Sequence, residues 1–186
     1  MLLTSMTSTP SLAQTPIPSS TSENDKAAPD PVVLALTRAR EFRAKGEFNE
    51  AMRMIDKALE SVPRDLQLRF MKGLIFSDQS QSDPTKGDQA IAVFESLTQD
   101  YPEVGEPHNN LAVLLAGKGE LERARYALER AILAQPNYAL AYENLGDIYL
   151  RLAEKSYGEA NLKNPSSKSA KTKLDQARGW VKAVEK

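Results

Sequence analysis

Apolar residues recur at helical spacing on either side of a short turn in residues 105–138. In the first segment, Pro107 suits the opening turn of a helix, and Leu111 and Leu115 follow at intervals that place them on one face. The turn Gly117-Lys118-Gly119 comes next, and its two glycines are expected to adopt positive φ angles. The second segment predicts another helix with one apolar stripe, Leu121, Ala124, Leu128, Ala131 and Ile132. Neither helix can bury its stripe alone, so the pattern predicts that similar helix pairs stack on this one.

The pattern of the second helix recurs twice towards the amino terminus. In the central pair the intervals are four, three and five residues, from Ala124 through Leu128 and Ala131 to Pro136. The same intervals connect Ala51, Ile55, Ala58 and Pro63, and also Ala90, Phe94, Leu97 and Pro102. The first helices share a small residue three positions before a large apolar one, at Ala39 and Phe42, Gly73 and Phe76, Ala112 and Leu115, and Gly146 and Tyr149. The chain is therefore expected to be a stack of helix pairs.

These spacings resemble those of the tetratricopeptide repeat family over about Pro31 to Pro165. The segment from Tyr142 to Tyr149, YENLGDIY, is similar to the first-helix motif of that family. The resemblance implies a small bacterial protein with an all-α fold, a right-handed superhelix of stacked antiparallel helix pairs. We expect units at about 32–65, 66–104, 105–138 and 139–165, followed by a capping helix at 167–184.

The first and second units depart from the repeat. The first unit has Arg38 where later units have Leu111 and Leu145, which predicts a solvent-exposed outer face that caps the stack. The second unit has five extra residues, expected to form a polar loop over 78–84 in which Asp83-Pro84 starts the next helix. This loop does not predict a calcium site, because the glycine and the final glutamate of such sites are missing.

The fourth unit has lost the turn between its helices. The second-helix spacing appears again, too soon after Tyr149 for the chain to reverse, at Ala153, Tyr157, Ala160 and Pro165. We therefore expect one long helix over about 140–163, packed against a last helix over 167–184. The stripe expected on the long helix is Tyr142, Leu145, Tyr149, Ala153, Tyr157 and Ala160. The stripe expected on the last helix is Ala170, Leu174, Ala177, Val181 and Val184, with Trp180 covering the end of the core.

Residues 1–30 are rich in serine, threonine and proline and are expected to be disordered. Within them, Ser11-Leu12-Ala13 has the small residues that precede a signal-peptidase cut, whereas the positive start and long apolar core of a complete signal peptide are missing. One interpretation is a truncated leader, which favours a periplasmic or otherwise exported protein. The alternative is a cytoplasmic protein with a flexible tail.

Composition leaves few residues for chemistry. With no cysteine and one histidine, the chain offers no ligand set for a transition metal, and we expect no cofactor. That histidine, His108, stands where the fourth unit has Tyr142, so we interpret it as a packing residue and predict that the protein is not an enzyme. The balance of 24 basic and 25 acidic residues disfavours a nucleic-acid partner. No apolar run is long enough to predict a membrane span.

The family resemblance also implies a function, because the first helices of such repeats line a concave groove that binds a peptide or helix of another protein. Carried over unit by unit, the groove-facing side chains are Leu36, Arg40, Arg43, Phe70, Leu74, Ser77, Asn109, Val113, Ala116, Glu143, Asp147 and Arg151. Asn109 and Val113 are the first choices, since they belong to the middle of the wall. The lysine and asparagine pairs that bind acidic chaperone tails in some relatives are missing. The surface runs instead from basic through apolar to acidic residues.

Two alternatives stay open. Phe70, Leu74 and Val113 are equally explained by packing against neighbouring helices. The protein is also compatible with a structural role, in which the long fourth helix or the last helix pairs with its own copy, so a monomer or a weak homo-oligomer is expected. Enzymatic activity is a distant third hypothesis.

Overall fold

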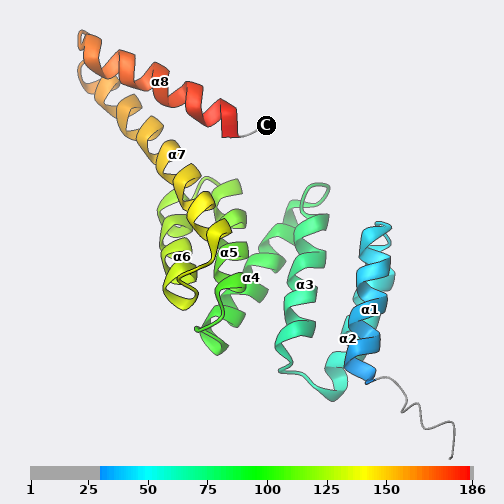
Figure 1. Cartoon of the computed structure of the whole chain (residues 1–186). Helices are drawn as coiled ribbons and strands as arrows, with labels where there is room; N and C mark the ends of the chain where they lie inside the picture. Colours follow the sequence, from blue (N-terminus) through cyan, green and yellow to red (C-terminus); the bar gives the residue numbers. More distant parts are fainter. Residues whose placement is uncertain (1–29, 185–186) are drawn as a thin grey trace, which may run out of the picture.

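The computed structural model describes residues 30–184, which form helices joined by short turns (Figure 1). The helices are α1 (Pro31–Ala44), α2 (Phe48–Ser61), α3 (Leu66–Gln79), α4 (Pro84–Asp100), α5 (Gly105–Gly117), α6 (Leu121–Ala134), α7 (Ala139–Lys163) and α8 (Lys168–Val184). No strand occurs within these residues, so the predicted all-α fold is confirmed. The expected leader, with Ser11-Leu12-Ala13, lies outside the described residues.

Consecutive helices form antiparallel pairs, α1 with α2, α3 with α4, α5 with α6 and α7 with α8. The second helix of each pair also packs on the first helix of the next pair, which stacks the pairs into the arc of Figure 1. This arrangement confirms the predicted solenoid of helix pairs. The single long helix of the fourth unit is present as α7, and α8 runs back along it.

Aspartates begin three of the helices. Asp83 accepts a hydrogen bond of 2.9 Å from the backbone N–H of Thr85, and Pro84 occupies the first turn of α4. The side chains of Asp30 and Asp65 cap α1 and α3 in the same way. Each cap satisfies one of the N–H groups that have no partner inside a helix. The helix start predicted at Asp83-Pro84 is therefore present.

The same turn joins the two helices of the first unit and of the third unit. Lys45-Gly46-Glu47 and Lys118-Gly119-Glu120 place their glycines at φ angles of 75° and 76°. In both turns the glutamate N–H donates a hydrogen bond of 2.9 Å to a carbonyl of the preceding helix, that of Phe42 or of Leu115. This is the glycine-dependent closure that commonly ends a helix. The positive φ predicted for Gly117 was wrong, because that residue is the last of α5 and a single glycine makes the reversal.

The core consists of two clusters of buried side chains that meet at α3. Leu68 and Ile75 belong to the cluster shared with α1 and α2, while the other side of α3 packs on the cluster of α4 to α7. Phe94 of α4 is fully buried, and its ring centroid lies 5.6 Å from that of Phe70 in an edge-on contact. A Cβ placed on Gly73 would lie 2.8 Å from Cζ of Phe94. The small residue of the repeat thus lets α4 approach α3 closely.

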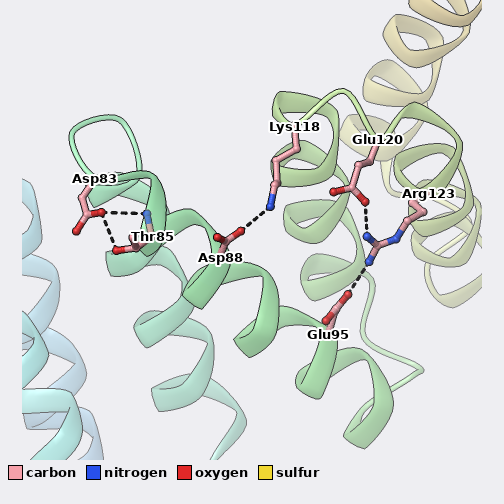
Figure 2. A network of polar contacts seen from close by, with 7 residues as sticks. All are labelled: Asp83, Thr85, Asp88, Glu95, Lys118, Glu120 and Arg123. Atoms are coloured by element: carbon pink, nitrogen blue, oxygen red, sulfur yellow. Dashed lines mark hydrogen bonds and ion pairs between the residues drawn. The ribbon is translucent and has the colours of Figure 1, made fainter.

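Polar contacts at the surface join the second unit to the third (Figure 2). Lys118 donates a 2.5 Å hydrogen bond to Asp88 of α4, and this bond raises the pKa of Lys118. Arg123 of α6 contacts both Glu95 of α4, at 2.7 Å, and Glu120. Solvent screens such exposed pairs and limits what they contribute to stability. The stacking of the units therefore depends mainly on the buried contacts.

The last helix packs on a different face of α7 from the one predicted. Its buried stripe, Ala170, Leu174, Ala177 and Val181, was predicted correctly, whereas Val184 is exposed. On α7, however, α8 meets the side that carries Glu154 and Gly158: Arg178 Nε lies 3.4 Å from Glu154 Oε1, and Leu174 reaches the space above Gly158. The stripe expected to face α8 is consequently left partly open, at Tyr142 and Tyr149.

The two ends of the stack compare differently with the expectations. Trp180 was predicted to cover the end of the core, which is wrong because its side chain is 63% exposed on the outside of α8. The outer face of the first unit is exposed as predicted, and it carries apolar side chains beside charged ones. Val33 and Leu34 are exposed there, beside a hollow of about 790 Å³ between α1 and α2 whose lining includes Arg38 and Lys57.

His108 is buried near the start of α5, and its ring Nε2 lies 3.3 Å from the carbonyl oxygen of Pro102. Burial lowers the pKa of His108, and the positive charge of Arg130 acts in the same direction, while the contact with Pro102 opposes them. The side chain therefore occupies the core as a neutral group, consistent with a packing role.

No helix among residues 30–184 combines the length and apolar character needed to cross a bilayer.

Replacing Gly119 by alanine is expected to lower the free energy of unfolding by about 1 kcal/mol, because alanine adopts a positive φ only with strain. Gly117→Ala is the matched control, since Gly117 lies two residues away in α5 and a Cβ at either position would have no atom within 4 Å. The control should be as stable as the parent or slightly more stable. Urea unfolding followed by circular dichroism measures both. Equal stability of the two variants would contradict the turn assignment.

The stability of the protein is expected to fall between pH 7.5 and 5.5. The pKa of His108 is lower in the folded state than its usual 6.5, so the unfolded chain binds more protons and stability is lost as the pH drops below about 6.5. Because His108 is the only histidine of the chain, His108→Tyr should remove most of this dependence, and tyrosine is the residue at the equivalent place in the fourth unit. The midpoints of urea unfolding of both proteins at pH 7.5 and at pH 5.5 measure this dependence. A flat profile for the parent protein would show that His108 is not held neutral.

Candidate functional site

A hollow of about 300 Å³ lies between the first helices of the third and fourth units, and we call it the α5–α7 hollow. Its apolar lining comes from Ala112 and Ala116 of α5, Leu128 of α6 and Ile148 of α7. Around these residues stand Val113, Gly117, Asn144, Asp147 and Arg151, and Val184 at the end of α8 completes the lining. The hollow exists because small residues on α5 leave space opposite α7, while α6 packs on both helices.

A hydrogen bond between two asparagines aligns α5 with α7. Asn144 Nδ2 donates to Asn109 Oδ1 over 2.8 Å, and Asn109 is buried. A buried amide that keeps its partner fixes the relative position of two elements, because sliding one past the other would leave a polar group unsatisfied. Asn109, a first choice for a contact residue, therefore positions the wall of the hollow, and its amide oxygen already has a partner.

Val113 is the apolar group that the hollow presents to solvent. It lies one turn after Asn109 on α5, and 53% of its surface is exposed although the neighbouring Ala112 and Ala116 are buried. The exposed valine beside small buried side chains provides an apolar surface on which a side chain of another molecule can rest. Of the sequence-predicted groove residues on α5, Val113 is thus the one that is open to contact.

Two charged side chains of α7 border the same hollow. Asp147 and Arg151 are one turn apart and half-buried, and neither forms an ion pair with any residue in the 30–184 range. Glu143, another turn earlier, is exposed. The rim therefore offers a carboxylate and a guanidinium at a fixed spacing beside an apolar floor. This is a surface for binding and orienting a partly charged segment.

The amino-terminal half of the predicted groove has a different character. Leu36 is buried in the core of the first units, and Phe70 and Leu74 pack on the cluster of α4 to α7. Arg43 makes two hydrogen bonds to Asp78, from Nε at 2.6 Å and from Nη2 at 3.0 Å, which connect α1 to α3. These side chains stabilise the stack.

The remaining predicted residues are Arg40, Ser77 and Ala116, and they lie in different places. Arg40 is exposed on α1 and Ser77 is half-buried near the end of α3, while Ala116 forms part of the hollow. The structure thus brings Val113, Ala116, Asp147 and Arg151 to one place and leaves the others apart.

Asn144 and Val184 are among the lining residues of the hollow that were not predicted from the sequence as groove residues. Asn144 is adjacent to the predicted Glu143, which stands where the third unit has Asn109, so the repeat spacing gave no signal for the bond between Asn144 and Asn109. Val184 had no signal either, because its place depends on how α8 crosses α7. In residues 30–184 no group of three or more histidine, aspartate or glutamate side chains is arranged to hold a metal ion.

Comparison with known proteins relates the fold to a protein family. A tetratricopeptide repeat model matches residues 85–139 and 118–161, which include both walls of the hollow. The chain is similar to the chloroplastic tetratricopeptide repeat domain-containing protein PYG7 of Arabidopsis thaliana, with 32% identity over 99 residues. That match covers 50% of this chain and 32% of PYG7, so the chain spans about a third of the length of this relative.

Solved structures agree on the architecture. The crystal structure of MamA protein superposes with a TM-score of 0.57 and 21% identity, over 82% of this chain and 85% of that one. PilF of Pseudomonas aeruginosa gives a TM-score of 0.57 at 18% identity, over 79% of this chain and 67% of that one. At these identities the likeness shows the fold alone. Together with the repeat spacings and the matching family model, it leads to one conclusion: the chain belongs to the tetratricopeptide repeat family.

Proposed function

We propose that the protein is an adaptor that binds a peptide or helix of a partner protein at the α5–α7 hollow. The tetratricopeptide repeat fold is a scaffold for protein–protein interaction, and its stacked helices build extended concave surfaces for that purpose. The observation that carries the more specific proposal is the exposed Val113 beside the hollow between the first helices of two units.

The size and lining of the hollow favour one apolar side chain as the main contact. Its volume of about 300 Å³ is at the lower end for sites that enclose a whole small molecule. Ala112, Ala116 and Ile148 offer an apolar floor, so an inserted side chain would lose its water without leaving a polar group unpaired. A single apolar anchor in a shallow pocket is a common way for a groove to hold a helix or peptide.

The charges at the rim favour a segment of defined polarity. Asp147 and Arg151 would contact a basic and an acidic side chain of the partner, and their separation by one turn suits charges of the same spacing on a bound segment. Charges at a rim contribute more to the choice of partner and to the rate of association than to affinity. A catalytic role is not part of the proposal.

Export is a second, separate proposal, which rests on the sequence Ser11-Leu12-Ala13 and leaves a cytoplasmic location as the alternative. If the segment is the end of a leader, protein purified from the cells that make it should begin at Gln14 or nearby. Mass spectrometry of the amino terminus measures this. A chain that retains Met1 and residues 2–13 would overturn the proposal.

The hollow is tested by placing a photoreactive amino acid at Val113 and, as a control, at Leu133, an apolar residue of α6 that is 67% exposed. Crosslinking in the cells that make the protein should capture a partner from position 113 and not from position 133. Val113→Asp should then weaken binding of that partner by about tenfold or more, because the apolar contact is lost and a charge is placed against it. Leu133→Asp should leave binding unchanged.

Both variants carry the same charge change at an exposed helix position, so a difference between them cannot come from net charge. Circular dichroism and unfolding in urea establish that each variant is folded. Capture from both positions alike, or equal binding by Val113→Asp and Leu133→Asp, would place the partner elsewhere on the molecule.

A further inference from the structure

The fourth unit has a first helix but no second helix packed on its usual face. In the third unit the residues of this face are buried, with His108 at 6% and Leu115 at 2% exposure. Their equivalents on α7 are Tyr142 at 51% and Tyr149 at 50%. Gly146, which stands where the second unit has Gly73, is exposed as well, and a Cβ placed on it meets no atom within 4 Å. The face that every other unit covers is therefore open here.

None of the helices that contact α7 covers this face, and α5 meets α7 at Asn144, on the side of the hollow. On α7, α6 packs on the side of Ile148 and α8 on the side of Glu154 and Gly158. At about 100° per residue, the stripe through Gly146 and Tyr149 is separated from each of these sides by roughly 120°. The stripe continues along α7 through Ala153 and Ala160, and none of its residues is charged. We call Tyr142, Gly146, Tyr149, Ala153 and Ala160 the open stripe.

The sequence of the missing second helix is nevertheless present, as the distal half of α7. The intervals from Ala153 through Tyr157 and Ala160 to Pro165 match those of the true second helices. The end of α7 matches them in geometry too. Asn164 closes α7 by donating to Ala160, as residues 62, 101 and 135 close α2, α4 and α6, and all four have φ between −138° and −134°. The helix α7 begins as a first helix and ends as a second helix.

We propose that two copies of the chain pair through α7 in antiparallel orientation, each supplying the second-helix surface that the other lacks. In this pairing Gly146 of one copy receives the ring of Tyr157 of the other, as Gly73 receives Phe94 within the second unit. Tyr157 lies at the edge of the open stripe, with Lys173 Nζ 5.7 Å from its ring centroid.

The register that joins Gly146 to Tyr157 is self-complementary. It also brings Tyr149 opposite Ala153 and Tyr142 opposite Ala160, so that each contact pairs an aromatic ring with a small residue. The same contacts recur when the two copies exchange places, as a two-fold axis requires. The axis passes near residues 151 and 152. Arg151 points away from the open stripe, towards the α5–α7 hollow, so the two guanidinium groups do not face each other.

The contact is limited to one helix from each copy, which predicts a weak dimer. Stable dimers usually bury about 1,600 Å² or more, and a single pair of helices buries less than that. A dissociation constant in the micromolar range is expected. The hollow faces another side of α7, so dimerisation and the proposed binding of a partner use different surfaces.

The test is sedimentation equilibrium of the full chain from about 1 to 300 μM, comparing the parent with two glycine variants. The parent should pass from monomer to dimer over this range. Gly146→Gln should weaken the dimer by about tenfold or more, because its side chain fills the place of the Tyr157 ring. The control is Gly179→Gln on α8, another exposed helical glycine with no atom near its Cβ position, and it should dimerise like the parent.

The same variants exclude a folding defect. Glutamine has a higher helix propensity than glycine, so both variants should unfold at an equal or higher urea concentration than the parent at 1 μM or below. A parent that stays monomeric throughout the range would overturn the proposal. Equal dimerisation by Gly146→Gln and the parent would overturn it too.

Disulfide trapping tests the register, since the chain contains no cysteine of its own. Tyr149→Cys and Ala153→Cys are prepared separately with different tags, mixed and oxidised. The antiparallel pairing predicts that the mixed covalent dimer exceeds either dimer of identical chains. Parallel pairing would link each variant to itself instead, and that result would contradict the proposed arrangement.

Discussion

A short amphipathic helix cannot bury its apolar stripe without a neighbour, and most features of this protein follow from that constraint. Within the second unit α4 covers the apolar stripe of α3, and Gly73 of α3 leaves room for the ring of Phe94. The third unit uses the same arrangement with Ala112 and Leu128, both buried. At the two ends of the stack the constraint is not fully met. The first unit keeps apolar residues on its outer face, and α7 keeps an open stripe along most of its length.

The α5–α7 hollow arises from the same stacking. Small side chains that allow helices to approach inside a unit also leave space between the first helices of adjacent units, where no third helix enters. The bond between Asn109 and Asn144 holds the two walls at a fixed register, so the hollow is already shaped before any partner binds. A preformed site loses less entropy on binding than one that must be assembled.

Much of this architecture could be predicted from the sequence, because the spacing of small and large residues is set by helix geometry. The turns, the long α7 and the buried stripe of α8 all follow from such spacing. The faces that pack between helices were harder to predict. Leu36 was assigned to a groove and is buried, since a pattern places a helix face only to within about a quarter turn. The approach of α8 to Gly158, and with it the position of Val184, depends on tertiary contacts that no local pattern records.

The division of the core at α3 has a consequence for motion. Stacked repeats are stable through interactions between immediate neighbours, so each boundary between clusters is a place where the stack can open locally. The helices α1 and α2 rest on α3 through Leu68, Ile75 and the pair of Arg43 with Asp78, whereas the hollow draws its buried residues from the other cluster. Opening of the first unit would expose its amides to hydrogen exchange while α5 and α7 stay protected. The helices α1 and α2 and the helices around the hollow thus belong to two separate cooperative units of one continuous stack.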